Sequence, residues 1–267
     1  MANIDVMPAK TSSARADEGQ RPLSWYFNLP LLVSGFLIIT AITLGARTYQ
    51  QYFGWWYGLD STAPEFQTYW MTLLYAELVV IPLVGVVMAA YIWLTHDHDL
   101  SNLAPETELK RYITFITLLF IYAWTFYWAA SFFGEQDASW HQVVVRDTSF
   151  TASHIIVFYL MFPLFIIQGI AIMLYTSTRL PLYAKGVSIP LLLAVVGPFM
   201  VFPNVGLNEW GHAFWVMEEV FTLPLHYGFV FFGWAILALG GILVQLMARM
   251  SVLFAQIFGA EAGKSGA

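Results

Sequence analysis

The 267-residue chain contains no cysteine, and only 10% of its residues are charged. The absence of cysteine excludes disulfides, thiolate-bound zinc, iron–sulfur clusters and covalently attached c-type haem within this chain. The low charge argues against a soluble domain, because such domains carry roughly 25% charged residues. The 11 Lys and Arg against 17 Asp and Glu give a net charge of −6, which argues against a nucleic acid partner. We therefore expect a polytopic membrane protein whose metal ligands, where it has any, are His, carboxylate, amide or Met.

Long apolar stretches dominate what is present, since 59% of the residues are hydrophobic and the mean hydropathy is +0.66. Apolar runs of about 20 residues have the length of a membrane-spanning helix. We expect an all-α fold, an integral membrane helical bundle of six or seven transmembrane helices. The six expected spans cover residues 27–46, 68–94, 112–134, 153–176, 188–206 and 225–248. Prolines should kink or end the fifth span, at Pro190, Pro198 and Pro203.

The chain divides into one membrane domain with two short tails. Residues 1–24 are polar and of low complexity, so we expect a disordered cytoplasmic tail there. Residues 25–249 form the transmembrane helical domain, which carries two groups of histidines. Residues 250–267 follow as a short, Ala- and Gly-rich C-terminal tail.

Lys and Arg are distributed unevenly between the two sides of a six-span arrangement. Nine of the 11 fall on one side, and only Arg47 and Arg146 fall on the other. Positively charged loops tend to stay in the cytoplasm, so we expect both termini there. The loops at 47–67, 135–152 and 207–224 should then face the outer, periplasmic side. The nine inner residues are Lys10, Arg15, Arg21, Lys110, Arg111, Arg179, Lys185, Arg249 and Lys264.

Four of the six histidines occur in two groups of the same shape. In the first group Asp137 precedes His141 by four residues, and His154 opens the next expected span. At helical spacing, residues four apart lie on one face. A metal ion held by two imidazoles and one carboxylate keeps coordination positions open for water or substrate. Imidazole suits copper, zinc and iron. These three residues are a candidate metal site on the outer side.

The second group repeats the pattern with an amide in place of the carboxylate. Asn208 precedes His212 by four residues, and His226 again opens a span. The neutral amide should bind a divalent ion more weakly than a carboxylate does. A single histidine at a membrane interface more often hydrogen-bonds to backbone or water. Two matching groups in one chain favour metal binding over that alternative.

Three further polar residues admit two interpretations each. His96 and His98 lie in the HDHD tract after the second span, which is either a metal site or, as we favour, a solvated loop. Glu77 lies inside the second span, where an ionisable residue is functional by default. The alternative for Glu77 is a protonated or hydrogen-bonded packing residue.

Several motifs resemble one family. The stretches EQDASWHQVVVRDTSFTASHIIVFY (135–159) and GPFMVFPNVGLNEWGHAFWVMEEVFTLPLHYGFVFFGW (197–234) are similar to the C-type subunit of the particulate methane monooxygenase and ammonia monooxygenase family. GLDSTAPEFQTYWM (58–71) and TRLPLYAKG (178–186) extend the resemblance. It covers most of residues 45–245.

The resemblance implies a membrane-bound copper monooxygenase in the bacterial cytoplasmic or intracytoplasmic membrane. The chain would assemble with the A-type and B-type subunits as a trimer of heterotrimers. It would act with O2, a quinol-level electron donor and a small apolar or ammonia-like substrate. Copper is the implied cofactor, and zinc is an alternative ion at the carboxylate site. The implied metal-binding and catalytic residues are Asp137, His141 and His154 at one site and Asn208, His212 and His226 at a neighbouring site.

The substrate stays open among ammonia, methane and a short-chain alkane. Ser149, Ala152 and Val157 depart from the methane-branch pattern DTDFTPSHIIEFY, whereas APEFQTYWM looks more like that branch. Two other classes of protein also fit the residues. One is a haem-binding membrane anchor of a quinone oxidoreductase, with His154 and His226 as axial ligands. The other is an ion-coupled transporter, which the absence of a clear two-half repeat of spans disfavours.

Overall fold

The computed structural model describes residues 21–133, 136–137, 140, 143–146, 150–197 and 237–262. These ranges are mainly helical and contain no strand apart from one isolated β-bridge. The helices of the first half, where η marks a π-helix, are α1 (Leu23–Tyr26), α2 (Leu29–Tyr57), α3 (Pro64–Phe66), η1 (Gln67–Met71), α4 (Thr72–Leu94), α5 (Pro105–Phe126) and η2 (Tyr127–Phe133). Those of the second half are α7 (Ala152–His154), η3 (Ile155–Met161), α8 (Phe162–Arg179), α9 (Pro181–Ala184), α10 (Ile189–Val196) and α13 (Gly241–Ala262).

Five helical stretches of the described chain are long and apolar enough to cross a membrane. They are Leu29–Tyr57, Pro64–Leu94, Pro105–Ala129, Ala152–Arg179 and Leu237–Gly259. This confirms the expected all-α polytopic membrane protein. Of the expected fifth span, 188–206, only the part up to residue 197 is described, and α10 lies in it. The last helix continues to Ala262, so most of the expected tail 250–267 is helical.

The first span is longer than the sequence indicated. Residues 47–57, which we expected in an outer loop, continue α2 as far as Tyr57. Aromatic packing accounts for the difference, because Phe53 and Tyr57 stack on Tyr69 with ring centroids 4.8 and 4.7 Å apart. These aromatic residues therefore join α2 to η1.

Capping side chains mark where two of the helices begin. The Asn28 side chain accepts a hydrogen bond from the Leu31 N–H at 3.2 Å at the start of α2. The Ser188 hydroxyl does the same for the Leu191 N–H at 3.2 Å at the start of α10. Such caps satisfy N–H groups that have no partner within the helix.

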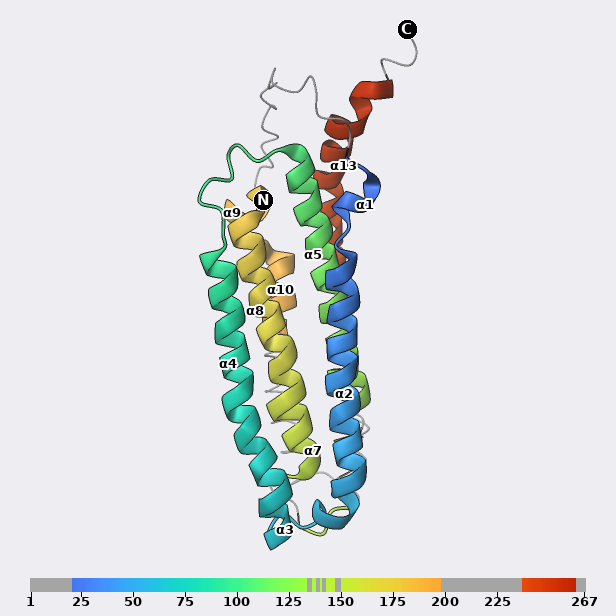
Figure 1. Ribbon diagram of the computed structural model, residues 1–267, viewed down its shortest axis with the longest axis vertical. Helices are drawn as coiled ribbons and strands as arrows, with labels where there is room; N and C mark the ends of the chain where they lie inside the picture. Colours follow the sequence, from blue (N-terminus) through green and yellow to red (C-terminus); the bar gives the residue numbers. More distant parts are fainter. Residues whose placement is uncertain are drawn as a thin grey trace.

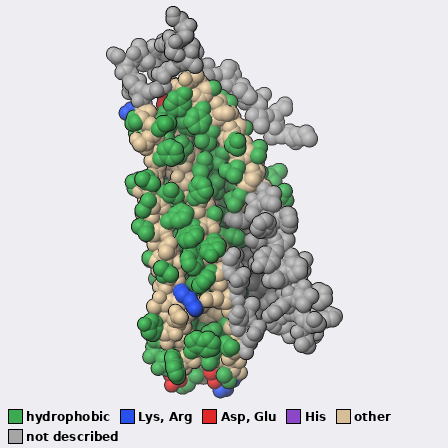
Figure 2. Space-filling view, turned by 90° about the vertical axis from the view of Figure 1, so that its right-hand side faces the viewer, with side chains coloured by type: hydrophobic (Ala, Val, Ile, Leu, Met, Phe, Trp, Pro, Cys, Tyr) green, Lys and Arg blue, Asp and Glu red, His purple; other side chains and the backbone are tan. Residues whose placement is uncertain are grey.

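The long helices run side by side along the vertical axis of Figure 1. α3 and α7 lie at one end of the bundle, which we call the α3 end. α1, α9 and the α4–α5 connection lie at the other, which we call the α9 end. α8 packs against both α4 and α5, and α5 also packs against α2 and α13. Figure 2 shows hydrophobic side chains along most of the described face, as a lipid-facing surface requires.

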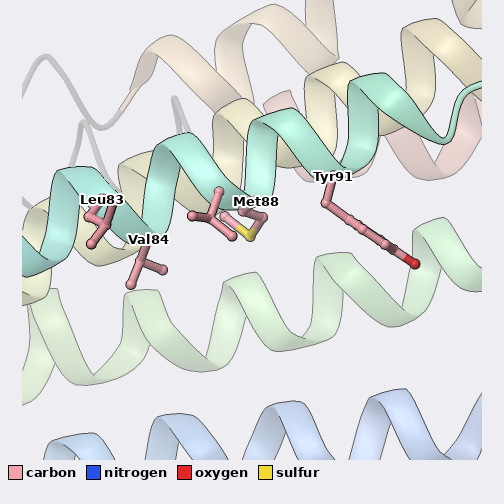
Figure 3. A pocket seen from close by; sticks show the side chains of 5 residues that line it. Leu83, Val84, Met88 and Tyr91 are labelled. Atoms are coloured by element: carbon pink, nitrogen blue, oxygen red, sulfur yellow. The ribbon is translucent and has the colours of Figure 1, made fainter.

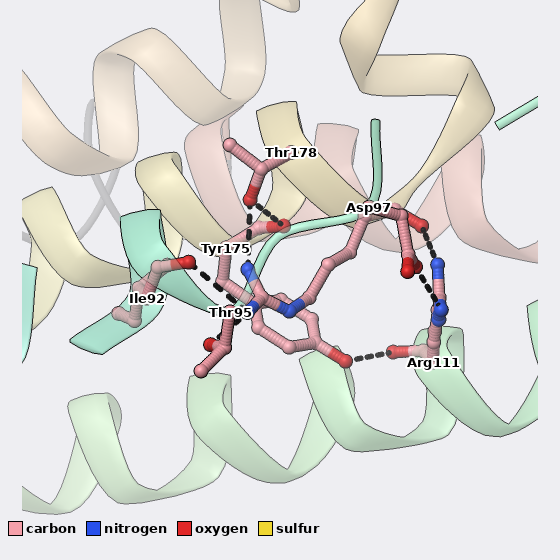
Figure 4. Close-up of polar contacts among 7 residues, drawn as sticks. Ile92, Thr95, Asp97, Arg111, Tyr175 and Thr178 are labelled. Atoms are coloured by element: carbon pink, nitrogen blue, oxygen red, sulfur yellow. Dashed lines mark hydrogen bonds and ion pairs between the residues drawn. The ribbon is translucent and has the colours of Figure 1, made fainter. Parts of the chain in front are cut away.

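The α9 end is held by arginines that bind backbone carbonyls (Figure 4). Arg179 donates to the Ile92 carbonyl at 3.1 Å and to the Thr95 hydroxyl at 2.7 Å. Arg111 donates to the Arg179 carbonyl at 3.1 Å and pairs with Asp97. Asp97 of the HDHD tract therefore ties the α4–α5 connection to α5.

Two buried carboxyl groups of the spanning helices have opposite surroundings. Glu108 accepts two hydrogen bonds from the Arg249 guanidinium, at 2.8 and 2.7 Å, which join α5 to α13. Glu77 on α4 is 5% exposed, and neither of its carboxyl oxygens has a hydrogen-bond partner. The Glu108–Arg249 pair is a structural contact between helices, whereas Glu77 contributes no polar contact to helix packing.

We expect Glu108→Gln to lower the free energy of unfolding by about 1.5–3 kcal/mol, because it removes a hydrogen-bonded charge partner of Arg249. Glu77→Gln is the matched control, because Gln has the same size, adds no charge and breaks no hydrogen bond. It should change stability by less than about 1 kcal/mol. Denaturant unfolding of the purified complex measures both. Equal losses for the two variants would contradict this account.

Candidate metal centre

Asp137 and His154, which the sequence pattern assigns to one candidate site, meet at the α3 end. His154 Nε2 lies 3.4 Å from Asp137 Oδ2. Both side chains are buried, with 5% of His154 and 12% of Asp137 exposed. Two of the three candidate ligands of the first group thus form a close imidazole–carboxylate pair.

The other four candidate ligands fall outside the described residues. They are His141 of the first group and Asn208, His212 and His226 of the second. Within the part of the chain that the structure describes, no three His, Cys, Asp or Glu side chains come together. The proposed ligand sets therefore stay predictions.

π-Helices flank the imidazole–carboxylate pair on both sides in the sequence. η2 ends shortly before Asp137, and η3 begins directly after His154. η2 and η3 also pack against each other. π-Helical turns are rare and often occur at functional sites. Sequence reasoning missed them, because both stretches are apolar at nearly every position, so an extra residue per turn leaves no visible change of pattern.

The distance between the pair fits a shared metal ion. Charge-assisted N–H···O hydrogen bonds measure about 2.7–2.9 Å, so 3.4 Å is long for such a bond. Two donor atoms that each lie about 2.0–2.2 Å from one tetrahedral ion are roughly 3.3–3.5 Å apart. One carboxylate oxygen and one imidazole nitrogen at this separation match that arrangement.

The imidazole is buried, and an aromatic ring packs beside it. The Phe158 ring lies 4.9 Å from the His154 ring, one helical turn further along the chain. Ile155, Ile156 and Val157 are each at most 1% exposed. Such surroundings exclude water, which strengthens the attraction between a cation and a carboxylate.

Two residues that the sequence analysis did not join also lie near this site. Arg146 belongs to residues 143–146, the Arg146 segment, and its guanidinium lies 2.6 Å from the carboxylate of Asp60. Asp60 belongs to residues 58–63, which we call the α2–α3 connection. Hydrogen bonds from the Thr62 hydroxyl and N–H hold the pKa of Asp60 below its usual range, and Arg146 adds to this effect. The sequence contained one indication of this pair, because Arg146 is one of only two cations expected on the outer side.

An apolar groove runs along α4 away from the imidazole–carboxylate pair. Leu83, Val84, Val87, Met88 and Tyr91 line it, and Figure 3 shows four of these labelled on one side of α4. It contains neither candidate ligand. Its lining suits apolar chains and does not supply groups for acid–base or metal chemistry.

The fold and site define a class of protein. The chain is a polytopic helical membrane protein that buries an imidazole and a carboxylate together at one end of its bundle. The AmoC family, described as the C-type subunit of ammonia monooxygenase/methane monooxygenase, matches residues 11–257. The chain belongs to this family, which confirms the resemblance that its motifs indicated. Among curated proteins, none matches the chain.

We expect Gly58→Ala to destabilise the α3 end. An added Cβ would lie 2.7 Å from the Gly54 carbonyl oxygen and 3.1 Å from the Cβ of Ala152, two residues before His154. Crowding of this kind costs about 1–3 kcal/mol. Gly45→Ala on α2 is the matched control, because nothing lies within 4 Å of its added Cβ.

Gly45→Ala should be neutral or stabilising by up to about 1 kcal/mol, since Ala favours the helix. Thermal unfolding of the purified complex compares the two variants. Equal stability of Gly58→Ala and the wild type would show that the α2–α3 connection does not pack closely against α7.

Proposed function

We propose that the chain is the C-type subunit of a copper-dependent membrane monooxygenase that uses O2 to hydroxylate ammonia, methane or a short-chain alkane. Membership of a family of monooxygenase subunits supports the reaction class. The observation that carries the metal proposal is the buried Asp137–His154 pair, 3.4 Å apart, in a member of that family.

The proposed ligand sets follow the two sequence groups. Asp137, His141 and His154 would hold one ion, for which copper and zinc both suit the donors. Asn208, His212 and His226 would hold a second ion. Copper at such a site supplies the redox chemistry that activates O2 for insertion into the substrate.

The chain's own residues contribute charge and exclusion of water. Asp137 supplies the only negative charge of its ligand set, so it offsets the charge of the ion. Phe158 packs on the His154 ring and limits its rotation. His154 is 4% exposed and directly precedes the buried residues of η3, so water has little access to the imidazole, which favours an apolar substrate dissolved in the membrane.

Assembly and orientation complete the proposal. The chain would join the A-type and B-type subunits in three copies each, with electrons from a quinol-level donor and with lipid around the exposed apolar faces. The charge distribution supports cytoplasmic termini and an outer α3 end. The family membership favours this assignment over the haem-anchor and transporter alternatives.

Asp137→Ala tests the metal proposal, because it removes the only anionic ligand and leaves both imidazoles. We expect at least a tenfold loss of metal affinity at this site, with a parallel fall in turnover. Asp99→Asn on the α4–α5 connection is the control. Metal analysis and electron paramagnetic resonance of the complex in lipid nanodiscs provide the measurement. Unchanged metal content and turnover in Asp137→Ala would reject the site.

Cysteine labelling tests the orientation, because the chain contains no native cysteine. Val145 at the α3 end is 69% exposed, and Val187 at the α9 end is 77% exposed. A membrane-impermeant thiol reagent should label Val145→Cys from the outer side of intact cells. It should label Val187→Cys only after permeabilisation. The reverse pattern would invert the proposed topology.

A further inference from the structure

The α2–α3 connection and the Arg146 segment are joined through their backbones. The Val145 N–H donates to the Leu59 carbonyl at 2.8 Å. The Ser61 hydroxyl donates to the Arg146 carbonyl at 3.1 Å, and the Ser61 N–H donates to the same oxygen at 3.4 Å. Residues 60 and 146 form the isolated β-bridge. The Arg146 segment lies between Asp137 and His154 in the sequence.

The side chains of the bridge residues form an ion pair. The Arg146 guanidinium donates to the Asp60 carboxylate at 2.6 Å across 86 residues of sequence. Asp60 is in turn oriented by the Thr62 hydroxyl and N–H, at 2.7 and 3.0 Å. The carboxylate is therefore fixed by its own turn and points at Arg146.

Aromatic and glycine contacts hold the same region on its other side. Trp140 packs beside Trp55 with ring centroids 5.6 Å apart. It also covers Gly54 so closely that an added Cβ would lie 2.9 Å from the Trp140 ring. Gly58 meets Ala152 in the same way at the start of α7. The end of α2 contacts the stretch between the two candidate ligands before the Arg146 segment, and the α2–α3 connection contacts it at and after that segment.

We propose that the Asp60–Arg146 ion pair is a positioning device for the metal centre. It anchors the stretch that joins Asp137 to His154, so that the carboxylate and the imidazole stay at metal-binding separation. Arg146 and Asp60 are positioning residues, since they would act on Asp137 and His154 through the chain that joins the two. This inference rests on the proposed function, because it assigns the pair a role at that metal site.

The physical reason is pre-organisation. Residues 138–153 separate Asp137 from His154 in the sequence, and bringing two ligands so connected to one ion costs chain entropy. A contact that already restrains this stretch lowers the entropy cost of binding. The Arg146 side chain is 62% exposed, so the effect is modest. Exposed ion pairs correspond to about a two- to fivefold change in an equilibrium constant.

The test removes one charge at a time in the complete complex and measures metal loss to a chelator. Asp60→Asn and Arg146→Gln should each accelerate metal loss from the Asp137 site by about two- to fivefold. The double variant should match either single variant, because both remove the same pair. Asp99→Asn is the matched control, since Asp99 makes the same turn contacts with the Ser101 N–H and hydroxyl at 2.8 and 2.6 Å. It should leave metal loss unchanged.

Three readouts separate positioning from a merely structural role. The charge-swapped variant Asp60→Arg with Arg146→Asp should restore slow metal loss, which loss of packing would not allow. In about 1 M salt the Debye length is roughly 3 Å, so the wild type should approach the rate of Arg146→Gln. Hydrogen exchange at the Val145 amide should also quicken in Arg146→Gln.

The outcomes distinguish this inference from the function on which it rests. A wild-type complex without metal at the Asp137 site would reject the proposed metal centre. Metal in the wild type with unchanged metal loss in both single variants would reject the positioning role alone. Faster exchange at Val145 with unchanged metal loss would also reject it, because the segment would then move without affecting the ligands.

Discussion

Several buried polar groups in this bundle bind partners within the protein, because a bilayer offers no water to replace them, and Glu77 of α4 is an exception. α5 shows how this constraint fixes helix pairing. Its Glu108 binds Arg249 of α13, and its Tyr122 hydroxyl donates to a carbonyl of α10 at 2.8 Å. Its Thr125 hydroxyl donates to Gln168 of α8 at 3.0 Å. A few polar contacts thus decide which helices are neighbours, while apolar burial alone would permit several arrangements.

The same constraint explains which features could be predicted from the sequence. Spans follow from hydropathy, because each must be apolar over its whole length, and the family follows from long local motifs. The spacing of Asp137 and His154 also placed the two in one group, and the structure brings them within 3.4 Å. Both residues border the same short stretch, so local spacing carried the information.

Contacts between distant residues could not be predicted in this way. Asp60 and Arg146 are 86 residues apart, and each alone resembles an ordinary exposed charge. The extension of α2 to Tyr57 depends on rings of η1 that pack against it, which no property of residues 47–57 reveals. π-Helical turns depend on a shift in backbone hydrogen bonding that leaves composition unchanged. Sequence patterns indicate burial, whereas these features depend on which residues become partners.

The position of the imidazole–carboxylate pair suits the two kinds of species that the proposed reaction requires. A metal ion arrives through water, and the α3 end carries the carboxylates of Asp60, Glu65 and Asp137, which favour cations there. An apolar substrate and O2 dissolve in the membrane, and the helices around the pair expose apolar side chains along their length. His154 lies where these two environments meet, at the point where a polar connection becomes the apolar η3. An ion from solution could not reach a metal-binding residue deeper in the bundle. A metal-binding residue beyond the end of the helix would be exposed to water. The end of a spanning helix, where the Phe158 ring packs beside the imidazole, is the position that meets both requirements.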